Sequence, residues 1–291
     1  MSEPQDFAGR VALITGGTQG LGYAVADLLR ARGAAGLVVV GRDRAKGEAA
    51  ATALNDDNCR AVFVSADLYT AAGCEAAVAA VDAEFGVCHA LVNSAAKTDR
   101  ASVWDATPEV WDDMLALNTR APALLAQGVA RIMAREGVDG SIVFIGSVAA
   151  HGGTETLLPY AVSKMALVAM TRNMAYTLMR HRIRVNLLNP GWMDTPAEDA
   201  TQRRWEGAGD NWLAEAEATQ PWGKLIKPNE IARTIVHLAT PDSGMLSGTS
   251  IDWDQTILGV GPGVRPGPEL GDLPADVGGP VGGHARGAAS S

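Results

Sequence analysis

The sequence contains few of the residues that build disulfide frameworks and metal centres. Its 291 residues include three cysteines, Cys59, Cys74 and Cys88, an odd number at spacings that match neither a disulfide framework nor a zinc site. The five histidines are scattered, without an HxxxH or HExxH arrangement. We therefore expect three reduced thiols without a function and a site that needs no metal.

The chain also lacks an excess of positive charge and any long apolar run. A formal net charge of −9 provides no basic surface for nucleic acid. No apolar run approaches the roughly 20 residues that span a bilayer. The first ten residues, MSEPQDFAGR, show no basic segment followed by an apolar one, as a signal peptide would. These absences predict a cytoplasmic protein with neither nucleic-acid nor membrane partners.

What the sequence does contain is a regular alternation of apolar, strand-like runs and helical patterns. With 47% hydrophobic residues, the chain is able to bury a large core. Strands are predicted at 10–15, 36–41, 60–67, 89–95, 140–147, 183–191 and 248–253, and helices at 21–33, 44–54, 71–86, 108–136, 159–181 and 227–239. This alternation predicts a doubly wound α/β fold (Rossmann fold), in which ligands bind beyond the carboxyl ends of the parallel strands.

The composition changes near residue 258. Residues 1–258 are predicted to form a single domain, whereas the last 33 residues, 259–291, contain ten glycines and five prolines with few apolar anchors. A segment of that composition cannot bury enough apolar surface to offset its ordering. We expect an extended or disordered tail outside the core.

The first predicted strand runs into a glycine-rich segment, TGGTQGLG, at residues 15–22. Gly16, Gly20 and Gly22 allow a tight turn and a close approach of a ligand to the backbone. The helix that follows offers unpaired N–H groups and a partial positive charge to a pyrophosphate. The spacing GxxxGxG is not the GxGxxG fingerprint, so its position directly after the first strand is what favours a dinucleotide site.

A second motif, YAVSK, lies at residues 160–164 within a predicted helix. Positions i and i+4 share one helix face, which brings the ammonium of Lys164 near the phenol of Tyr160. A fixed cation favours the phenolate, so we expect Lys164 to lower the pKa of Tyr160 from its usual value of about 10. The pair is a candidate general acid or base, although a chance pair on a surface helix would have the same spacing.

With three further motifs in the same order, the sequence resembles the classical short-chain dehydrogenase/reductase family over roughly residues 8–254. The matched positions are Thr15 to Gly22 (TGxxxGxG), Asn118 in LALNTRAP, Ser147 in FIGSVAA, Tyr160 and Lys164 (YxxxK), and Pro190–Gly191 (PG) with Thr195 beyond it. Five motifs at family spacing make a chance match implausible.

The resemblance implies a catalytic tetrad of Asn118, Ser147, Tyr160 and Lys164. Tyr160 would exchange a proton with the substrate oxygen, and Ser147 would hydrogen-bond and orient that oxygen. Lys164 would lower the pKa of Tyr160 and bond the nicotinamide ribose, while Asn118 would hold a water that links Lys164 to solvent. The cofactor would carry the hydride, so the protein groups supply the proton and the alignment.

The resemblance also implies NAD(P) as the cofactor. The residues placed around it are Gly16, Thr18, Gln19, Gly20, Leu21, Gly22, Arg42, Asp67, Leu68, Asn93, Ala95, Tyr160, Lys164, Pro190, Gly191, Met193 and Thr195. An NAD site places an acidic residue at the end of the second strand, on the ribose 2′-OH. Here Gly41 occupies that position and Arg42 follows, and a guanidinium binds a phosphate well. We expect NADP over NAD, although Asp43 could turn inward and Arg42 could stack on the adenine or lie in solvent.

Two segments depart from the family pattern. The family's NNAG reads Asn93–Ser94–Ala95–Ala96, which replaces a glycine close to the cofactor. Its near-terminal DGG turn reads Asp254–Gln255–Thr256, which alters the wall around the substrate.

The variable substrate lid of the family corresponds to about residues 192–222. This segment holds four of the seven tryptophans, Trp192, Trp205, Trp212 and Trp222. Each alone is explained by packing, but as a group they predict flat hydrophobic faces over a sugar ring or an apolar ketone. Upstream, His151 and Glu155 could touch the substrate, although a solvated loop is the expected role.

The complete tetrad favours an enzyme over a catalytically idle dinucleotide-binding regulator. We expect an oxidoreductase that interconverts a secondary alcohol (a polyol, a sugar or a similar hydroxy compound) and its ketone. The alternative is a carbonyl or 3-oxoacyl reductase, which the lack of a basic patch for a carrier protein or coenzyme A makes less favoured. Family relatives commonly assemble through the helices at 108–136 and 159–181, so we expect a homotetramer or homodimer that acts on a small molecule.

Overall fold

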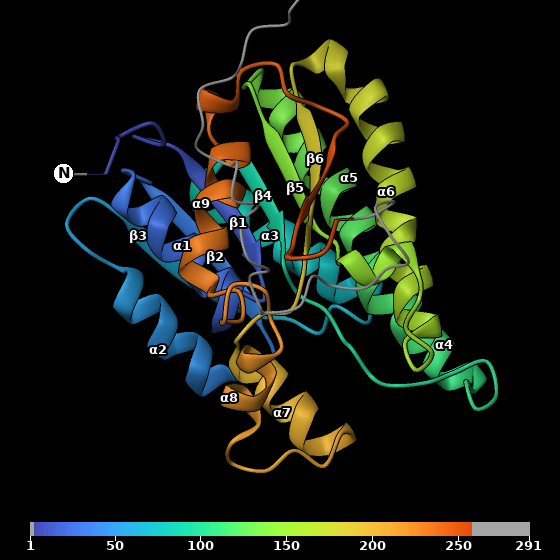
Figure 1. The fold of residues 1–291 in the computed structure, drawn as a ribbon. Helices are drawn as coiled ribbons and strands as arrows, with labels where there is room; N and C mark the ends of the chain where they lie inside the picture. The colour runs from blue at the N-terminus through green and yellow to red at the C-terminus, as the bar shows by residue number, and fades with distance from the viewer. Residues whose placement is uncertain (1–2, 258–291) are drawn as a thin grey trace, which may run out of the picture.

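Seven parallel strands form one sheet at the centre of the computed structural model, which describes residues 3–257 (Figure 1). The strands are β1 (Val11–Thr15), β2 (Gly36–Gly41), β3 (Arg60–Ser65), β4 (Ala90–Asn93), β5 (Ser141–Ile145), β6 (Arg184–Pro190) and β7 (Ser250–Trp253). Their order in the sheet is β3-β2-β1-β4-β5-β6-β7, with every neighbouring pair parallel. The chain starts in the middle of the sheet and winds outward in both directions, which confirms the predicted doubly wound fold.

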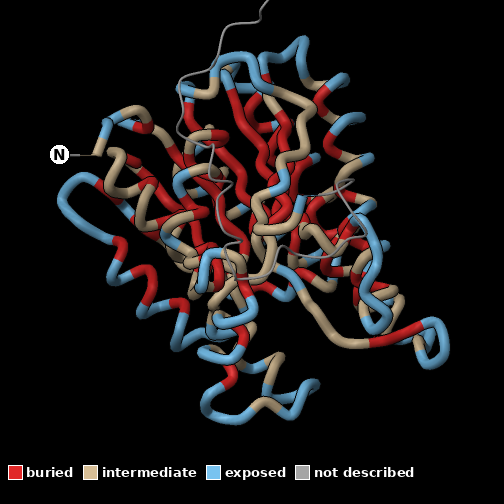
Figure 2. Tube along the Cα trace, in the orientation of Figure 1, coloured by how far each residue is buried: buried red, intermediate tan, exposed pale blue. Residues whose placement is uncertain are grey.

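Helices cover both faces of the sheet, as crossover connections require. One face carries α1 (Gly20–Ala31), α2 (Arg44–Leu54) and α9 (Pro228–Ala239), and the other carries α3 (Ala71–Phe85), α5 (Ala121–Glu136) and α6 (Leu158–Leu178). Along β1, Ala12 and Ile14 join the first apolar cluster, whereas Val11 and Leu13 join the second. Every residue of β1 is therefore buried, and the sheet forms the inner layer seen in Figure 2.

Apart from the helix at 108–136, the predicted strands and helices are present, with ends that differ from the prediction by three residues at most. Two helices were not predicted, α7 (Pro196–Trp205) and α8 (Trp212–Ala218). They lie in the segment expected to form the lid, at the carboxyl edge of the sheet (Figure 1, bottom). Short 3-10 turns complete the described elements, at Val148–His151, Met179–His181 and Pro241–Ser243.

One prediction needs correction, the single helix over 108–136. The structure divides it into α4 (Pro108–Leu115), a π-helical turn (Ala116–Arg120) and α5. Pro122 has no N–H, so it cannot donate to the carbonyl of Asn118 as an α-helix requires. Single π-turns inside α-helices are frequent at functional sites, and Asn118 lies in the middle of this one.

The tail predicted at 259–291 lies outside the described residues. Within residues 3–257, no helix combines the length and the apolar character needed to cross a bilayer. The three cysteines are buried and free, as predicted. Over the same range, no group of three or more histidine, cysteine, aspartate or glutamate side chains could hold a metal ion.

Candidate active site

A cavity of about 1020 Å³ lies at the carboxyl edge of the sheet, lined by the loops that follow β1 to β6 and by the starts of α6 and α7. This is the crevice where doubly wound sheets bind ligands. The predicted site residues on its wall are Gly16, Thr18, Gln19, Gly20, Leu21, Gly22, Arg42, Leu68, Ala95, Ser147, Tyr160, Lys164, Pro190, Gly191, Met193 and Thr195. Tertiary folding thus brings together residues from seven segments of the chain: the loops after β1, β2, β3, β4 and β5, the start of α6, and the end of β6 with the loop after it.

Two positions in the turn after β1, Gly16 and Gly22, have room only for glycine. Gly16 has φ +65°, and a Cβ there would lie 3.0 Å from the backbone nitrogen of Ala95. A Cβ on Gly22 would lie 2.3 Å from the carbonyl oxygen of Gly16. Thr15 fixes this turn to the neighbouring strand, because its Oγ1 accepts hydrogen bonds from the backbone nitrogens of Ser94 and Ala95, both at 3.1 Å. The backbone can therefore approach a ligand closely on this side.

The first turn of α1 faces the same cavity. Its N-cap residue, Gln19, makes no side-chain cap hydrogen bond, so the first N–H groups of the helix have no side-chain acceptor. Gln19, Gly20 and Leu21 all line the cavity. Exposed N–H groups at a helix N-terminus fit a pyrophosphate.

Two cationic side chains, Arg42 and Lys46, follow the end of β2. Arg42 lies over the ring of Tyr69, with its Cζ 5.6 Å from the ring centroid, and both residues line the cavity. Asp43 caps α2 by accepting from the backbone nitrogen of Lys46 at 3.0 Å, so its carboxylate is engaged by its own helix. The ammonium of Lys46 donates to Gln19 at 3.3 Å, which places a second cation beside Arg42 on the cavity wall.

The helix α6 presents the acid–base pair to the cavity. Tyr160 and Lys164 lie one turn apart on it, both buried, and the Nζ of Lys164 is 5.7 Å from the centroid of the Tyr160 ring. The same Nζ donates to the carbonyl oxygen of Ile145 at 2.8 Å. Ser147, two residues further along that loop, is held by its Oγ accepting from Ala149 nitrogen at 3.1 Å.

Burial dominates the proton affinities of this pair. It raises the pKa of Tyr160 to about 12, against a smaller opposing effect of a hydrogen bond with Ser147. It lowers the pKa of Lys164 to about 7. The direction is opposite to the one expected from Lys164: burial raises the pKa of Tyr160, and the opposing effects come from the hydrogen bond with Ser147 and the charge of Arg100.

Asn118 lies behind the cavity wall rather than on it. Its Nδ2 donates to the Oγ of Ser163 at 3.0 Å, and that hydroxyl donates to the carbonyl oxygen of Tyr160 at 2.7 Å. Its Oδ1 accepts from the backbone nitrogen of Lys97 at 2.9 Å. The side chain thus joins the π-turn to the first turn of α6, so it positions the backbone that carries Tyr160.

Polar side chains line the part of the wall contributed by the lid and by the segment after β4. Arg100 comes from that segment, and Glu198 and Gln202 come from α7. The Oε1 of Glu198 accepts from Gln202 and from the indole nitrogen of Trp192, both at 2.8 Å. The pocket that faces Ser147 and Tyr160 is therefore richer in hydrogen-bonding groups than the sequence suggested.

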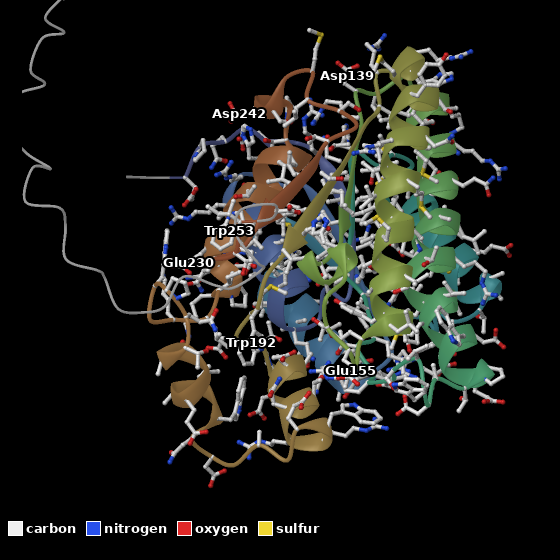
Figure 3. All side chains as sticks on the ribbon, turned by 45° about the vertical axis from the view of Figure 1, so that its right-hand side comes forward. Asp139, Glu155, Trp192, Glu230, Asp242 and Trp253 are labelled. Carbon is white, nitrogen blue, oxygen red and sulfur yellow. The ribbon has the colours of Figure 1, made fainter. Side chains whose placement is uncertain are left out.

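The four lid tryptophans do not act as one flat surface, which corrects the prediction. Trp192 alone of the four lines the cavity, at the junction of the sheet and the lid helices (Figure 3). Trp212 is buried behind it, with the two ring centroids 6.5 Å apart. Trp205 lies under the guanidinium of Arg204, and Trp222 is exposed. Packing and surface positions explain three of the four.

His151 and Glu155 lie off the cavity wall, as the solvated-loop interpretation predicted. His151 pairs through Nε2 with Asp252 Oδ1 at 3.0 Å, and Glu155 is exposed. Neither side chain lines the cavity beside Tyr160.

The altered turn near the end of the domain does reach the cavity. Asp254 and Thr256 line it. Gln255 instead holds the end of the lid, because its side chain accepts from the nitrogen of Trp222 at 2.9 Å and donates to the carbonyl of Lys224 at 2.8 Å. The departure from DGG therefore changes both the wall and the support of the lid.

Comparison with known proteins agrees with this geometry. Residues 16–255 match a family model described as enoyl-(acyl carrier protein) reductase. The short-chain reductase protein NovJ of Streptomyces niveus is 34% identical over 84% of this chain and 92% of its own length. Galactitol 2-dehydrogenase of Agrobacterium fabrum is 31% identical over 84% and 96%. The structure of a 3-ketoacyl-(acyl-carrier-protein) reductase from Brucella melitensis complexed with NADH is 28% identical over 85% and 98%, with a TM-score of 0.76.

The chain belongs to the short-chain dehydrogenase/reductase family. It is therefore an oxidoreductase that acts on CH–OH groups with NAD(P). The glycine turn, where a Cβ would meet backbone atoms, and the uncapped start of α1 fit a dinucleotide. The alternative of a catalytically idle regulator is set aside.

Two predicted cofactor residues of this dehydrogenase/reductase do not line the cavity. Asp67 is exposed and accepts from the backbone nitrogen of Tyr69 at 3.1 Å, so it shapes the turn that carries Leu68 and Tyr69. Asn93 is 3% exposed, and its side-chain nitrogen and oxygen have no hydrogen-bond partner among the described residues. It lies in register with Thr15, directly below the glycine turn.

Sequence reasoning missed Lys46, Arg100 and Glu198. Lys46 had a usable signal, since it lies in the first turn of the helix predicted directly after the β2 end that carries Arg42. Arg100 and Glu198 had none, because each belongs to an irregular or variable segment whose path depends on the rest of the fold.

Proposed function

We propose that the enzyme interconverts a secondary alcohol (a polyol, a sugar or a similar hydroxy compound) and its ketone, with NADP preferred to NAD. The observation that carries this proposal is that Ser147, Tyr160 and Lys164 share one cavity with the glycine-rich turn. NAD(P), when bound, supplies the hydride acceptor or donor. The chain's own residues supply the alignment of the substrate oxygen and its proton.

With a pKa of about 12, the phenol of Tyr160 keeps its proton at neutral pH and is able to donate it to a carbonyl oxygen. Ser147 is fixed through its Oγ by Ala149, which leaves its hydroxyl proton for the same substrate oxygen. Lys164 gains or loses a proton near neutral pH beside Tyr160, which suits a group that restores the proton that Tyr160 gives up. Asn118 completes the proton path by holding a water. Its carbonyl lacks an α-helical donor, because Pro122 in the first turn of α5 has no N–H.

The preference for NADP rests on charge at the end of β2. Arg42 and Lys46 both line the cavity there, and neither pairs with a carboxylate among the described residues. Asp43, the side chain that would repel a 2′-phosphate, is turned to the N-terminus of α2. Asp43 lines the same part of the cavity, but its Oδ1 is engaged by the backbone of α2, so the two cations favour a phosphate over a hydroxyl group.

A second candidate is reduction of a 3-oxoacyl thioester or another carbonyl compound. The description of the family model and the name of the Brucella melitensis structure favour it. The polar wall formed by Arg100, Glu198 and Gln202 favours the first candidate, because hydroxyl groups of a polyol would hydrogen-bond to it and an acyl chain would not.

A substrate screen separates the two candidates. Polyols, sugars and secondary alcohols are tested with NADP and NAD, and ketones and a 3-oxoacyl thioester with the reduced cofactors, with turnover read at the nicotinamide absorbance. The Tyr160→Phe variant serves as the control. The highest kcat/KM on an alcohol or its ketone supports the proposal, whereas the highest value on the thioester selects the second candidate. Absence of turnover on every compound would contradict both.

We also propose a homotetramer, or a homodimer, built on α6. Four apolar side chains are exposed on that helix and its end: Val162, Met165, Tyr176 and Met179. Exposed apolar side chains on one helix mark a protein interface. Light scattering on the purified protein tests this, and a monomer at micromolar concentration would contradict it.

A further inference from the structure

Arg100 is a half-buried cation in the cavity that holds the reacting groups. Its side chain is 18% exposed and lines the same cavity as Ser147 and Tyr160. It comes from the segment between β4 and α4, which runs along the lower edge of the domain in Figure 1. Charged side chains are seldom buried to this extent unless something pairs with them.

The position of Arg100 relative to Tyr160 is fixed by backbone pairing. The next residue, Ala101, forms a parallel bridge with Leu157, immediately before α6 begins. Ala101 nitrogen donates to Thr156 oxygen at 2.8 Å, and Leu158 nitrogen donates to Ala101 oxygen at 3.1 Å. Arg100 is therefore anchored to the helix start that carries Tyr160, and its charge acts on Tyr160 by favouring the ionised phenol.

The guanidinium of Arg100, which lines the cavity, keeps donors that no described residue uses. Its Nε donates to Glu206 at 2.8 Å, at the end of lid helix α7, and its Nη1 donates to the carbonyl of Thr98 at 3.1 Å. Its Nη2 makes no hydrogen bond to any of residues 3–257. Five N–H donors in a planar fork suit a carboxylate, which binds two of them at once.

Glu198 also lines this region but does not neutralise Arg100. Its Oε1 is engaged by Trp192 and Gln202, and no ion pair joins it to Arg100 within the described part of the chain. The pair of Arg100 with Glu206 is only partly screened from solvent, since Glu206 is 46% exposed. The Nη2 edge of Arg100 therefore remains without a partner among the described residues, in the cavity that also holds Ser147 and Tyr160.

We propose that Arg100 binds a carboxylate group of the substrate, so that the enzyme acts preferentially on hydroxy acids and the corresponding oxo acids. This inference rests on the proposed alcohol–ketone chemistry and narrows its substrate class. The carboxylate pairs with the Nη1 and Nη2 edge of the guanidinium, while the alcohol or ketone oxygen meets Ser147 and Tyr160. Glu206 holds Arg100 in place from the lid side and does not itself bind the substrate.

The test compares acids with neutral compounds of the same shape. Three oxo acids of increasing length, 3-oxobutanoate, 4-oxopentanoate and 5-oxohexanoate, are each paired with the primary amide, and kcat/KM is measured with NADPH. For at least one pair we expect the acid to exceed the amide by about 10-fold or more, the scale of a hydrogen bond to a charged group. Arg100→Gln should remove this preference, and Arg100→Lys should retain part of it.

Glu206→Gln is the matched control, because it breaks the same ion pair and leaves the guanidinium. It should keep the ratio of acid to amide even where both KM values change. Loss of the ratio in Glu206→Gln as well would mean that Arg100 only fastens the lid, and would overturn the proposal. A weaker affinity of Arg100→Gln for NADPH would also overturn the proposal, because it would assign the guanidinium to the cofactor phosphates.

Binding of the same acids and amides to the protein saturated with NADP, measured by calorimetry, keeps the test independent of turnover. Equal affinity for acid and amide in every pair would overturn the inference. Equal turnover of amides and acids would also overturn the inference about Arg100, but it would leave the alcohol–ketone proposal intact. Failure of the broader substrate screen would instead contradict that proposal itself.

Discussion

The sheet and the lid of this enzyme are held together in different ways. In the sheet, β1, β5 and most of β2 and β6 are fully buried, and the two helical layers close over them. In the lid, the apolar cluster is small: Trp212, Ala216 and Leu225 are its buried members. Apolar burial therefore fixes the framework, whereas the lid depends on other contacts.

Those other contacts in the lid are ion pairs and indole hydrogen bonds. Lys227 joins Asp194 at 2.8 Å and Glu217 at 2.6 Å, and all three side chains are about one-quarter to one-third exposed. The indole of Trp212 donates to Asp199 at 2.7 Å. Partly exposed ion pairs contribute little to stability and weaken with salt, so we expect the lid to be held less tightly than the framework.

The largest effect is expected on the framework side of this comparison, at Tyr160. Tyr160→Phe removes the exchangeable proton and keeps the ring, so kcat should fall by at least about 100-fold, the lower end of acid–base contributions. The affinity for NADP should change little, because the substitution leaves the glycine turn and Lys164 in place. Near-normal turnover of the variant would remove Tyr160 from the mechanism.

The pH dependence of the free energy of unfolding tests how well the framework excludes water from Lys164. Its folded pKa is about 7, below the unfolded value of about 10.5, so the unfolded state binds more protons between those values. The free energy of unfolding should therefore rise with pH in that window, by about 1.4 kcal/mol per pH unit for this one group. Below pH 7 both states are protonated and the group adds no slope.

The Lys164→Met variant lacks this titrating group. The free energy of unfolding of wild type minus that of the variant, measured in urea, should therefore increase by a few kcal/mol between pH 7 and pH 10. Lys46→Met, which changes an exposed lysine, is the matched control and should run parallel to wild type. Parallel curves for all three proteins would show that water reaches Lys164 and that the framework is looser than its burial implies.

A smaller effect, on the selectivity between NADP and NAD, is expected from substitutions after β2, at the edge of the framework. Arg42→Ala and Lys46→Ala should each lower kcat/KM with NADP relative to NAD by about 10-fold, the loss of one charge-assisted contact. Arg44→Ala is the control, since Arg44 is exposed and pairs with Glu48 away from the cavity. A wild type that prefers NAD, or unchanged selectivity in both variants, would contradict the assignment.

The smallest effect is expected in the lid. Lys227→Gln removes the two ion pairs and should raise the substrate KM by about 2- to 5-fold with little change in kcat, as partly exposed pairs allow. The wild-type KM should rise with added NaCl, and that of the variant should not. Arg182→Gln, which breaks a pair with Asp139 at the end of the molecule far from Trp192 (Figure 3), is the control. If Lys227→Gln lowers the free energy of unfolding without changing KM, its ion pairs stabilise the domain as a whole and not the lid alone.

Much of the framework follows from the sequence alone, because its signals are local. Buried parallel strands read as short apolar runs, and the glycine turn and YAVSK owe their function to spacing within one turn or helix. The family resemblance added Ser147 and Asn118, and the structure places Ser147 beside Tyr160 and Asn118 behind the wall.

Tertiary structure decided what depends on contacts between distant segments. Burial from several elements raised the pKa of Tyr160 and lowered that of Lys164, although their spacing alone predicted the opposite shift for Tyr160. Pro122 and the packing against α6 turned one predicted helix into two with a π-turn between them. Arg100 reaches the cavity through its neighbour's bridge to Leu157, 56 residues away in the chain, a separation that no local periodicity encodes.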